Sequence, residues 1–453
     1  MEGIALMIAF IILVAVMIYA ISKLKLHPFL AILLTALVLA FISGISPSDI
    51  PGVIGAGFSG IFASIGIVIL LGGLIGFILE KTGGAFKIAN MVINLVGKAS
   101  PSLAMVLMGW VVSIPVFCDS GFVIMNPVRR SIVKRSGTSG VSTSLGLGGG
   151  LYISHVLVPP TPGPIAAANE LGLADNLVLV IGVGALISIP IIIVTYLYAE
   201  FCGKRTKSAE DHELAKDATV KSYEDIVKEY GTMPSGFLSL APVLVPIIAM
   251  TFGTVGAFLG WEGNLRQFSN FTGNAVIALA LGTICAVVLL AKSKKISDFN
   301  TLTNDTLKTM GPILFITGSG GALGQVIRSS GLVDFVAANA DALIGLGVFF
   351  PFLIAAVLKT AQGSSTVAIV TTASIMAPLM GILGFTTNFA AALVVMAIGA
   401  GSMMASHAND SYFWVVTRLS DMTPEQGYKN WTSMTVVQGL TAIIAIFVAS
   451  LFI

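Results

Sequence analysis

An acidic residue lies in the middle of an apolar stretch of this chain. Asp119 is flanked by Cys118 and Ser120 within residues 113–122, which read Ser-Ile-Pro-Val-Phe-Cys-Asp-Ser-Gly-Phe. A charged side chain at membrane depth costs at least about 2.5–3.5 kcal/mol, so it persists only when it is paired, hydrated or protonated. Burial favours the neutral form of a carboxyl group, which suits a proton carrier. The alternative is a structural cap, in which Asp119 accepts hydrogen bonds from backbone N–H groups.

A second polar cluster follows a glycine within residues 359–367, Lys-Thr-Ala-Gln-Gly-Ser-Ser-Thr-Val. Its consecutive hydroxyl side chains are Ser364, Ser365 and Thr366. The helix predicted from Val367 onward points its N-terminal N–H groups at these hydroxyls, which favours an anion such as a carboxylate. A plain Ser/Thr N-cap would explain only one hydroxyl. Lys359 either pairs with the acid group of a bound solute or extends to the membrane surface.

Two further segments combine polar residues with helix breaks. Residues 154–164 contain four prolines and a glycine, which cannot continue a helix, so Thr161 and the free carbonyl groups are expected to face a cavity. Residues 406–412 read Ser-His-Ala-Asn-Asp-Ser-Tyr. The side chains that could relay protons or bind a solute here are His155, His407, Asn409 and Asp410. The alternative for either histidine is a neutral ring bonded to a backbone carbonyl.

The composition indicates a helical membrane protein. The 453 residues are 56% hydrophobic and 10% charged, with a mean hydropathy of +0.96, whereas soluble domains have about 25% charged residues. Apolar runs of about 20 residues recur, as membrane-spanning helices require. A net charge of +2 gives no indication of a nucleic-acid partner. The three cysteines lack metal-binding or redox spacing, and no ATP-binding motif occurs, so we expect neither metal nor cofactor.

An internal repeat divides the chain into halves. The glycines of residues 71–83 align without a gap with those of residues 319–331, and Ser154-His155 recurs as Ser406-His407. Repeats in a very apolar chain are typical of secondary transporters, which bind solute where broken segments of the two halves meet. The distribution of Lys and Arg over the expected loops places the two repeats in opposite orientations.

We therefore predict an all-α integral membrane protein of two inverted repeats, each with five transmembrane helices and one re-entrant hairpin. The first repeat covers residues 1–202, with a hairpin at about 100–134 and a broken helix at about 138–173. The second covers residues 236–453, with a hairpin at about 344–380 and a broken helix at about 388–416. The remaining predicted spans are 3–22, 28–44, 57–80, 176–202, 236–259, 270–291, 309–328 and 432–453. Residues 203–235 form a cytoplasmic linker, which is either a plain connector or a regulatory segment.

The four polar motifs together resemble those of the gluconate permease family, a branch of the ion transporter superfamily. The resemblance rests on residues 114–122, 155–164, 362–369 and 406–414. It implies a carrier of gluconate and related sugar acids or of D-serine, coupled to protons. It also implies an elevator-like movement of the hairpins and broken helices, and a homodimer.

The sequence thus predicts a multi-pass protein of the cell (inner) membrane that imports gluconate or a related sugar acid by proton symport, with the lipid bilayer, protons and a small carboxylate as its partners. D-serine or another small hydroxy acid is the alternative solute. A channel, or an intramembrane enzyme with Asp119 and Asp410 as a catalytic pair, is the alternative from another class. The predicted substrate-binding residues are Ser120, Thr161, Lys359, Ser364, Ser365, Thr366 and Asn409. The predicted proton-coupling residues are Asp119, His155, His407 and Asp410.

Overall fold

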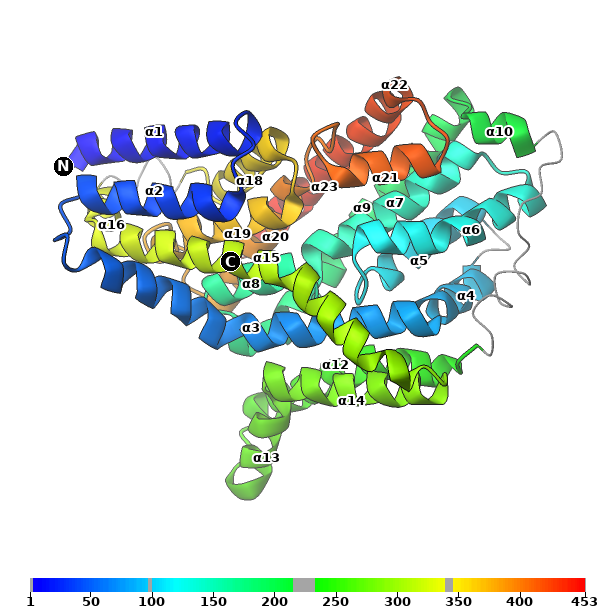
Figure 1. Ribbon diagram of the computed structural model, residues 1–453, viewed down its shortest axis with the longest axis horizontal. Helices are drawn as coiled ribbons and strands as arrows, with labels where there is room; N and C mark the ends of the chain where they lie inside the picture. The colour runs from blue at the N-terminus through cyan, green and yellow to red at the C-terminus, as the bar shows by residue number, and fades with distance from the viewer. Residues whose placement is uncertain (1–2, 97–99, 215–232, 339–344, 453) are drawn as a thin grey trace.

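Helices form all the regular structure in the described part of the computed structural model, which covers residues 3–96, 100–214, 233–338 and 345–452 (Figure 1). The predicted all-α class is confirmed. Most of the predicted linker, residues 215–232, and the first residue of the second predicted hairpin lie outside the described residues. The opposite orientation of the two repeats stays a prediction.

The helices of the first half are α1 (Gly3–Ser22), α2 (Pro28–Ile42), α3 (Ile50–Thr82), α4 (Gly84–Val96), α5 (Pro101–Val112), α6 (Cys118–Ser136), α7 (Gly140–Leu157), α8 (Pro162–Glu170), η1 (Ala174–Asn176), α9 (Leu177–Arg205) and α10 (Ala209–Leu214). Those of the second half are α12 (Gly236–Phe258), α13 (Gly263–Gly273), α14 (Ala275–Lys292), η2 (Ile296–Asp298), α15 (Phe299–Ser329), α16 (Leu332–Ala338), α18 (Phe349–Gln362), α19 (Ser365–Met376), η3 (Ala377–Leu379), α20 (Asn388–Ser402), α21 (Ser411–Leu419), α22 (Pro424–Gly427), η4 (Tyr428–Thr432) and α23 (Ser433–Ser450).

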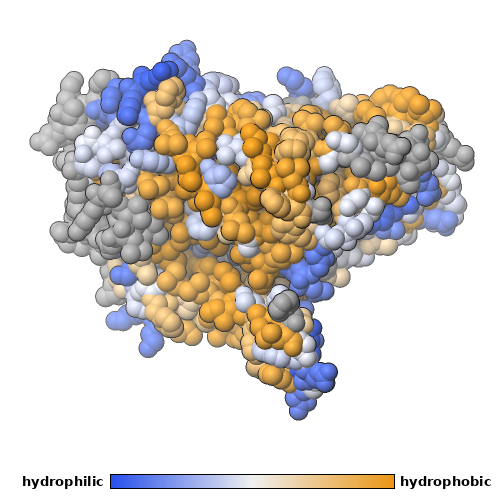
Figure 2. Space-filling model, turned by 180° about the vertical axis from the view of Figure 1, so that it is seen from behind, coloured by the Kyte–Doolittle hydropathy of each residue, from blue (hydrophilic) through white to orange (hydrophobic). Residues whose placement is uncertain are grey.

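Seven helical segments among the described residues are long and apolar enough to cross a membrane, and the bent α3 would make an eighth. The seven are Gly3–Ile21, Gly140–Glu170, Ala174–Arg205, Gly236–Ala257, Ala275–Lys292, Ile296–Ser329 and Pro424–Ser450. Two of the ten predicted spans contain shorter helices, because α2 and α20 have 15 residues each. Figure 2 shows a broad apolar surface across the middle of one face, as expected where lipid chains surround a protein.

The long helices α3 and α15 pack along one another and contact α2 and α14 (Figure 1). A second group of contacts joins α5 to α7, α7 to α9, α9 to α23, α23 to α20 and α20 to α18. The hairpins and interrupted helices belong to this second group, which meets the first through contacts of α3 with α8 and of α15 with α19. The polar motifs are therefore gathered in one group and the two long helices in the other.

The repeated glycines lie where the two groups touch. A Cβ at Gly76 on α3 would overlap the carbonyl oxygen of Pro115 at the tip of the first hairpin. A Cβ at Gly320 on α15 would lie 2.5 Å from Ser374 Oγ on α19, in the second hairpin. In each half, therefore, a glycine of the repeated motif allows a long helix to approach the hairpin of its own half. The glycines between Gly146 and Gly150 on α7 also allow close packing, since a Cβ at Gly150 would overlap the Val106 carbonyl of α5.

Each of the four polar motifs interrupts helical structure. The first hairpin consists of α5 and α6, with its tip at residues 113–117, and the second consists of α18 and α19, with its tip at residues 363–364. Residues 158–161 separate α7 from α8, and residues 403–410 separate α20 from α21. Gly363 has φ +90°, and a Cβ there would overlap the Asn409 carbonyl, so glycine is required where the second tip meets the second break.

Candidate functional site

A cavity of about 690 Å³ lies where both hairpin tips meet the second break and the end of α7. Its size is in the usual range for small-molecule sites. Eight of the eleven predicted site residues line it: Asp119, Ser120, His155, Ser364, Ser365, Thr366, Asn409 and Asp410. The other lining residues are Phe77, Phe117, Cys118, Tyr152, Thr309, Ile313, Ile316, Gln362, Gly363, Val367, Ser411 and Tyr412.

Three helices begin at this cavity. The first-turn residues of α6, α19 and α21 are among those that line it, so all three N-termini converge there. Helix N-termini carry unpaired N–H groups and a partial positive charge, which together bind anions. Ser364 Oγ accepts a hydrogen bond from Val367 N and thereby caps α19, whereas Phe117 supplies no side-chain cap to α6. The arrangement can hold a carboxylate without an arginine or lysine at the cavity wall.

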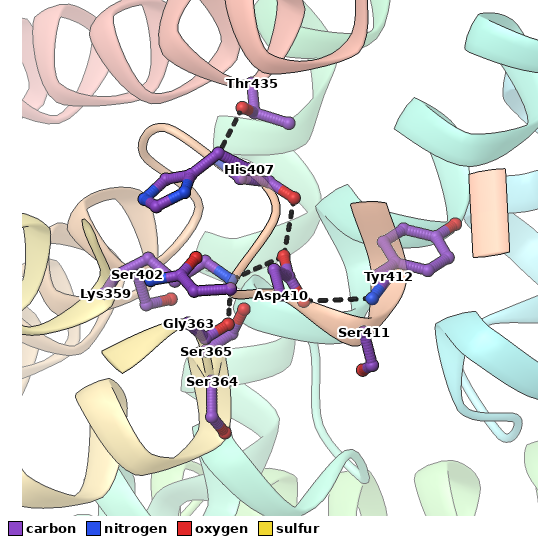
Figure 3. Close-up of polar contacts among 12 residues, drawn as sticks. Lys359, Gly363, Ser364, Ser365, Ser402, His407, Asp410, Ser411, Tyr412 and Thr435 are labelled. Atoms are coloured by element: carbon purple, nitrogen blue, oxygen red, sulfur yellow. Dashed lines mark hydrogen bonds and ion pairs between the residues drawn. The ribbon is translucent and has the colours of Figure 1, made fainter. Parts of the chain in front are cut away.

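Asp410 is already neutralised by a neighbour from the second hairpin. Figure 3 shows Lys359 and Asp410 pointing toward each other, and Lys359 Nζ lies 2.6 Å from Asp410 Oδ2. Asp410 also accepts hydrogen bonds from Ser406 Oγ (2.5 Å) and Tyr412 N (3.0 Å). Lys359 further donates to the Gly363 carbonyl, which fixes the hairpin tip against the break.

Asp119 has no such counter-charge. Its contacts are long ones from Ser411 Oγ (3.3 Å) and Cys118 Sγ (3.6 Å), and no described lysine, arginine or histidine forms an ion pair with it. Asp119 stands in the first turn of α6, whose N-terminus favours an anion. It is therefore the one acid lining the cavity that lacks a cationic partner among the described residues.

The hydrogen bonds around Ser365 determine whether its hydroxyl group donates to a solute or accepts from it. Tyr152 OH lies 2.8 Å from Ser365 Oγ and 3.2 Å from the Ser402 carbonyl oxygen. Because a carbonyl only accepts, the single phenolic proton goes to Ser402, and Ser365 must donate its own proton to Tyr152. Ser365 Oγ is then left with lone pairs that can accept a hydrogen bond from a solute.

Two polar side-chain atoms near the cavity are buried without a partner among the described residues. Asn409 donates through Nδ2 to the Thr360 carbonyl (2.9 Å), and its Oδ1 has no donor. His155 has an unpartnered Nδ1, and its ring lies beside that of Phe117. Buried polar atoms normally have partners, so these two are available to a bound molecule.

Three predicted site residues are not among those that line the cavity. Lys359 is 1% exposed and bonded to Asp410, so it neither extends to the membrane surface nor presents its ammonium group to a solute. Thr161 donates to the Val158 carbonyl (2.8 Å) and lies beside the first hairpin tip. His407 Nε2 donates to the Thr360 carbonyl (2.9 Å), which is the alternative weighed for a histidine. Among the described residues, the His407 ring forms no hydrogen bond or ion pair with the carboxylate of Asp410.

Sequence reasoning missed several residues of the cavity. Gln362 and Ser411 lie inside the motifs at residues 359–367 and 406–412 but were not chosen as site residues. Tyr152 lies two residues before the motif at residues 154–164, so a wider window would have included it. Thr309 and Phe77 come from α15 and α3 and lie outside the four polar motifs. They form the wall that the long helices contribute.

A polar cavity enclosed by interrupted helices within a multi-pass membrane protein defines a membrane transport protein. The chain belongs to the GntP permease family, because the model of the GntP family permeases matches residues 4–452. The protein is thus a multi-pass protein of the inner membrane, and the predicted family is confirmed.

Curated relatives cover nearly the whole chain. An uncharacterised permease of Haemophilus influenzae is 34% identical over 91% of this chain and 85% of its own length. A gluconate permease of Pseudomonas aeruginosa is 29% identical (96% and 95%), and the D-serine transporter DsdX of Escherichia coli is 28% identical (97% of each chain). The crystal structure of the YdaH transporter of Alcanivorax borkumensis is similar with a TM-score of 0.67 at 16% identity, over 94% of this chain and 97% of that one. The chain therefore shares its overall fold with a solved structure.

Proposed function

We propose that the protein imports gluconate or a closely related sugar acid by proton symport. The observation that carries the proposal is the pairing pattern of the two cavity acids: Asp410 is neutralised by Lys359, whereas Asp119 lacks a cation among the described residues. The converging N-termini of α6, α19 and α21 provide the place for the solute carboxylate. Ser365 Oγ and Asn409 Oδ1 accept hydrogen bonds from the solute hydroxyl groups.

Electrostatic repulsion couples the solute to the proton. Two negative charges about 5 Å apart repel by roughly 3 kcal/mol at an effective dielectric constant of about 20. An anionic solute therefore binds best when Asp119 is protonated, and a proton on Asp119 in turn favours the solute, because the linkage is reciprocal. His155 lines the same cavity and is the reserve proton site. His407 with Asp410 is a weaker alternative, since both are engaged in other contacts.

Transport is proposed to follow an elevator-type movement of the hairpins and interrupted helices against α3 and α15. Support comes from the glycines at this contact, such as Gly76 and Gly320, which present backbone rather than side chains to the hairpins. At these two positions the long helix has no side chain that could interlock with the hairpin and obstruct sliding. The two repeats are proposed to be inverted and the protein to be a homodimer.

D-serine is the second candidate solute, and the lack of a cationic partner for Asp119 in the described part of the chain favours it too. The ammonium group of an amino acid could pair with an ionised Asp119, while its carboxylate occupies the helix N-termini. A relative that is named a D-serine transporter adds to this candidate. In this proposal the protein moves its solute unchanged. Asp410 is unsuited to a catalytic pair with Asp119, because it is bonded to Lys359.

Uptake into proteoliposomes tests the proposal. Purified protein should concentrate labelled gluconate when the outside is more acidic, and the solute recovered from the lumen should be intact by mass spectrometry. Competition by gluconate, D-serine and hexanoate distinguishes the candidates, since hexanoate lacks hydroxyl groups. Changed solute would indicate an enzyme, and flux without accumulation would indicate a channel.

A further inference from the structure

The first residues of the linker between the two halves form hydrogen bonds with the helix group that contains the hairpins and interrupted helices. Asp211 accepts hydrogen bonds from Gly140 N at the start of α7 (2.7 Å) and from Ser208 N (2.9 Å). Ala209 N donates to the Asp421 carbonyl (3.1 Å), just after α21. Residues 206–211 are therefore attached to elements of both halves, which a plain connector does not require.

A buried ion pair lies at the centre of this attachment. Arg129 on α6 is 0% exposed and Glu210 is 1% exposed, and Arg129 Nη2 lies 2.7 Å from Glu210 Oε2. Arg129 also donates to Asn126 Oδ1 (2.8 Å), the Gly140 carbonyl (3.3 Å) and Thr143 Oγ1 (3.4 Å). A buried charge with this many partners is held in one geometry, and removing its counter-charge leaves it uncompensated.

The same cluster joins α6 to α21. Arg130 forms ion pairs with Glu210 (3.5 Å) and with Asp421. Asn126 Nδ2 donates to the Leu419 carbonyl (3.1 Å) at the end of α21. Arg130 and Asn126 thus connect two helices that lie nearly 300 positions apart in the sequence, and Glu210 holds the guanidinium groups of Arg129 and Arg130 beside this connection.

Both helices start at the cavity. Asp119 stands in the first turn of α6, and Ser411 is the first residue of α21. The two residues contact each other in the cavity wall, at 3.3 Å between Ser411 Oγ and Asp119 Oδ1. A helix is stiff over this length, so fixing the two C-terminal halves also fixes how the two N-termini face each other.

We infer that Glu210, through Arg129 and Arg130, is a positioning residue that holds α6 and α21 together and so sets the spacing of Asp119 and Ser411. This inference rests on the proposal that the cavity binds the solute. It assigns to the start of the linker the task of making the first hairpin and the second interrupted helix move as one unit.

Hydrogen–deuterium exchange of the full-length protein in nanodiscs tests the inference without a solute. In Glu210→Gln, amides in the first turns of α6 and α21 should exchange at least threefold faster, while those of α3 and α15 keep their rates. Glu210→Asp retains the charge and should restore slow exchange in part. Glu425→Gln removes an exposed acid of nearby α22 and serves as the matched control. Faster exchange throughout the protein, or unchanged exchange in α6 and α21, would overturn the inference.

Solute binding provides the second measurement. Glu210→Gln should weaken binding of labelled gluconate at least fivefold in the monodisperse fraction, and Glu425→Gln should not. If Glu210→Gln yields no folded protein, Asp421→Asn, whose side chain is 34% exposed, should weaken binding two- to threefold. Parent-like binding by these folded variants would contradict the inference. Weaker binding by Ser365→Ala would still support the cavity as the solute site in that case. If gluconate does not bind to the parent protein, the proposed solute is wrong, and the exchange result alone decides on Glu210.

Discussion

Lys359 Nζ lies 2.6 Å from Asp410 Oδ2, and both side chains are almost fully buried. The pair joins the second hairpin to the break between α20 and α21, because Lys359 comes from α18 and Asp410 caps α21. It also removes one negative charge from the cavity. The polar site therefore contains an acid that is committed to structure and another, Asp119, that is not.

Replacing the lysine should destabilise the protein rather than merely weaken solute binding. Lys359→Met leaves Asp410 buried without a counter-charge, which costs about 3–5 kcal/mol. We expect a clearly lower unfolding temperature and little monodisperse protein, while Lys359→Met with Asp410→Asn recovers part of the loss. Lys308→Met, at a lysine whose side chain is 79% exposed, is the control. A Lys359→Met protein of normal thermal stability that fails to bind solute would instead place this lysine at the solute.

Ser365→Ala should weaken solute binding with little effect on stability. Tyr152 keeps its hydrogen bond to the Ser402 carbonyl in this variant, so the hairpin tip loses only one neutral bond. The loss of one acceptor for a solute hydroxyl costs about 0.5–1.5 kcal/mol, or roughly two- to tenfold in dissociation constant. Ser374→Ala, a change at a buried serine further along the same helix, is the control. Isothermal titration with gluconate that finds equal affinities would exclude Ser365 from the site.

Alanine scanning of the glycines on α3 tests the contact between the long helices and the hairpins. Gly76→Ala places a methyl group against the backbone of Pro115, which cannot rotate away, so we expect slower uptake and lower thermal stability. In Gly55→Ala the added methyl group meets no atom within 4 Å. This variant should be as stable as the parent or more stable, since alanine is favoured over glycine in a helix by up to about 1 kcal/mol. Equal uptake by the two variants in proteoliposomes would show that the hairpin tip does not need this close approach.

Motif chemistry predicted much of the site because helix-breaking and polar residues are rare in an apolar chain. Asp119, Ser365 and Asn409 were identified in this way, and the structure brings them to one cavity. The partner of Lys359 could not be predicted, since its ion pair with Asp410 joins residues 51 positions apart through tertiary packing. Whether the linker is a plain connector or a regulatory segment stayed open for the same reason: a sequence does not reveal that Glu210 is buried against Arg129.

Cysteine labelling on the two sides of α14 tests the predicted orientation of the second half. The positive-inside bias places residue 262 outside and the basic residues at and after the end of α14, which include Lys292, inside. In a variant free of native cysteines, Glu262→Cys should react with an impermeant maleimide in intact cells, and Lys292→Cys should react only after the cells are opened. Both positions are exposed in the structure, so reactivity reports sidedness rather than burial. The reverse pattern would refute the orientation of this half.

Asp119→Asn should separate solute binding from proton coupling. Asparagine keeps the size of the side chain but cannot ionise, so the variant resembles the protonated carrier permanently. We expect counterflow exchange of gluconate to persist, because the solute no longer meets a negative charge at this position. Accumulation on an imposed proton gradient should be lost, and the acceleration of uptake at lower external pH should disappear with it. Asp49→Asn, at an exposed acid before α3, should behave as the parent. If Asp119→Asn still concentrates gluconate on a proton gradient, the coupled proton is carried elsewhere, and His155 is the next residue to replace because it lines the same cavity with an unpartnered ring nitrogen.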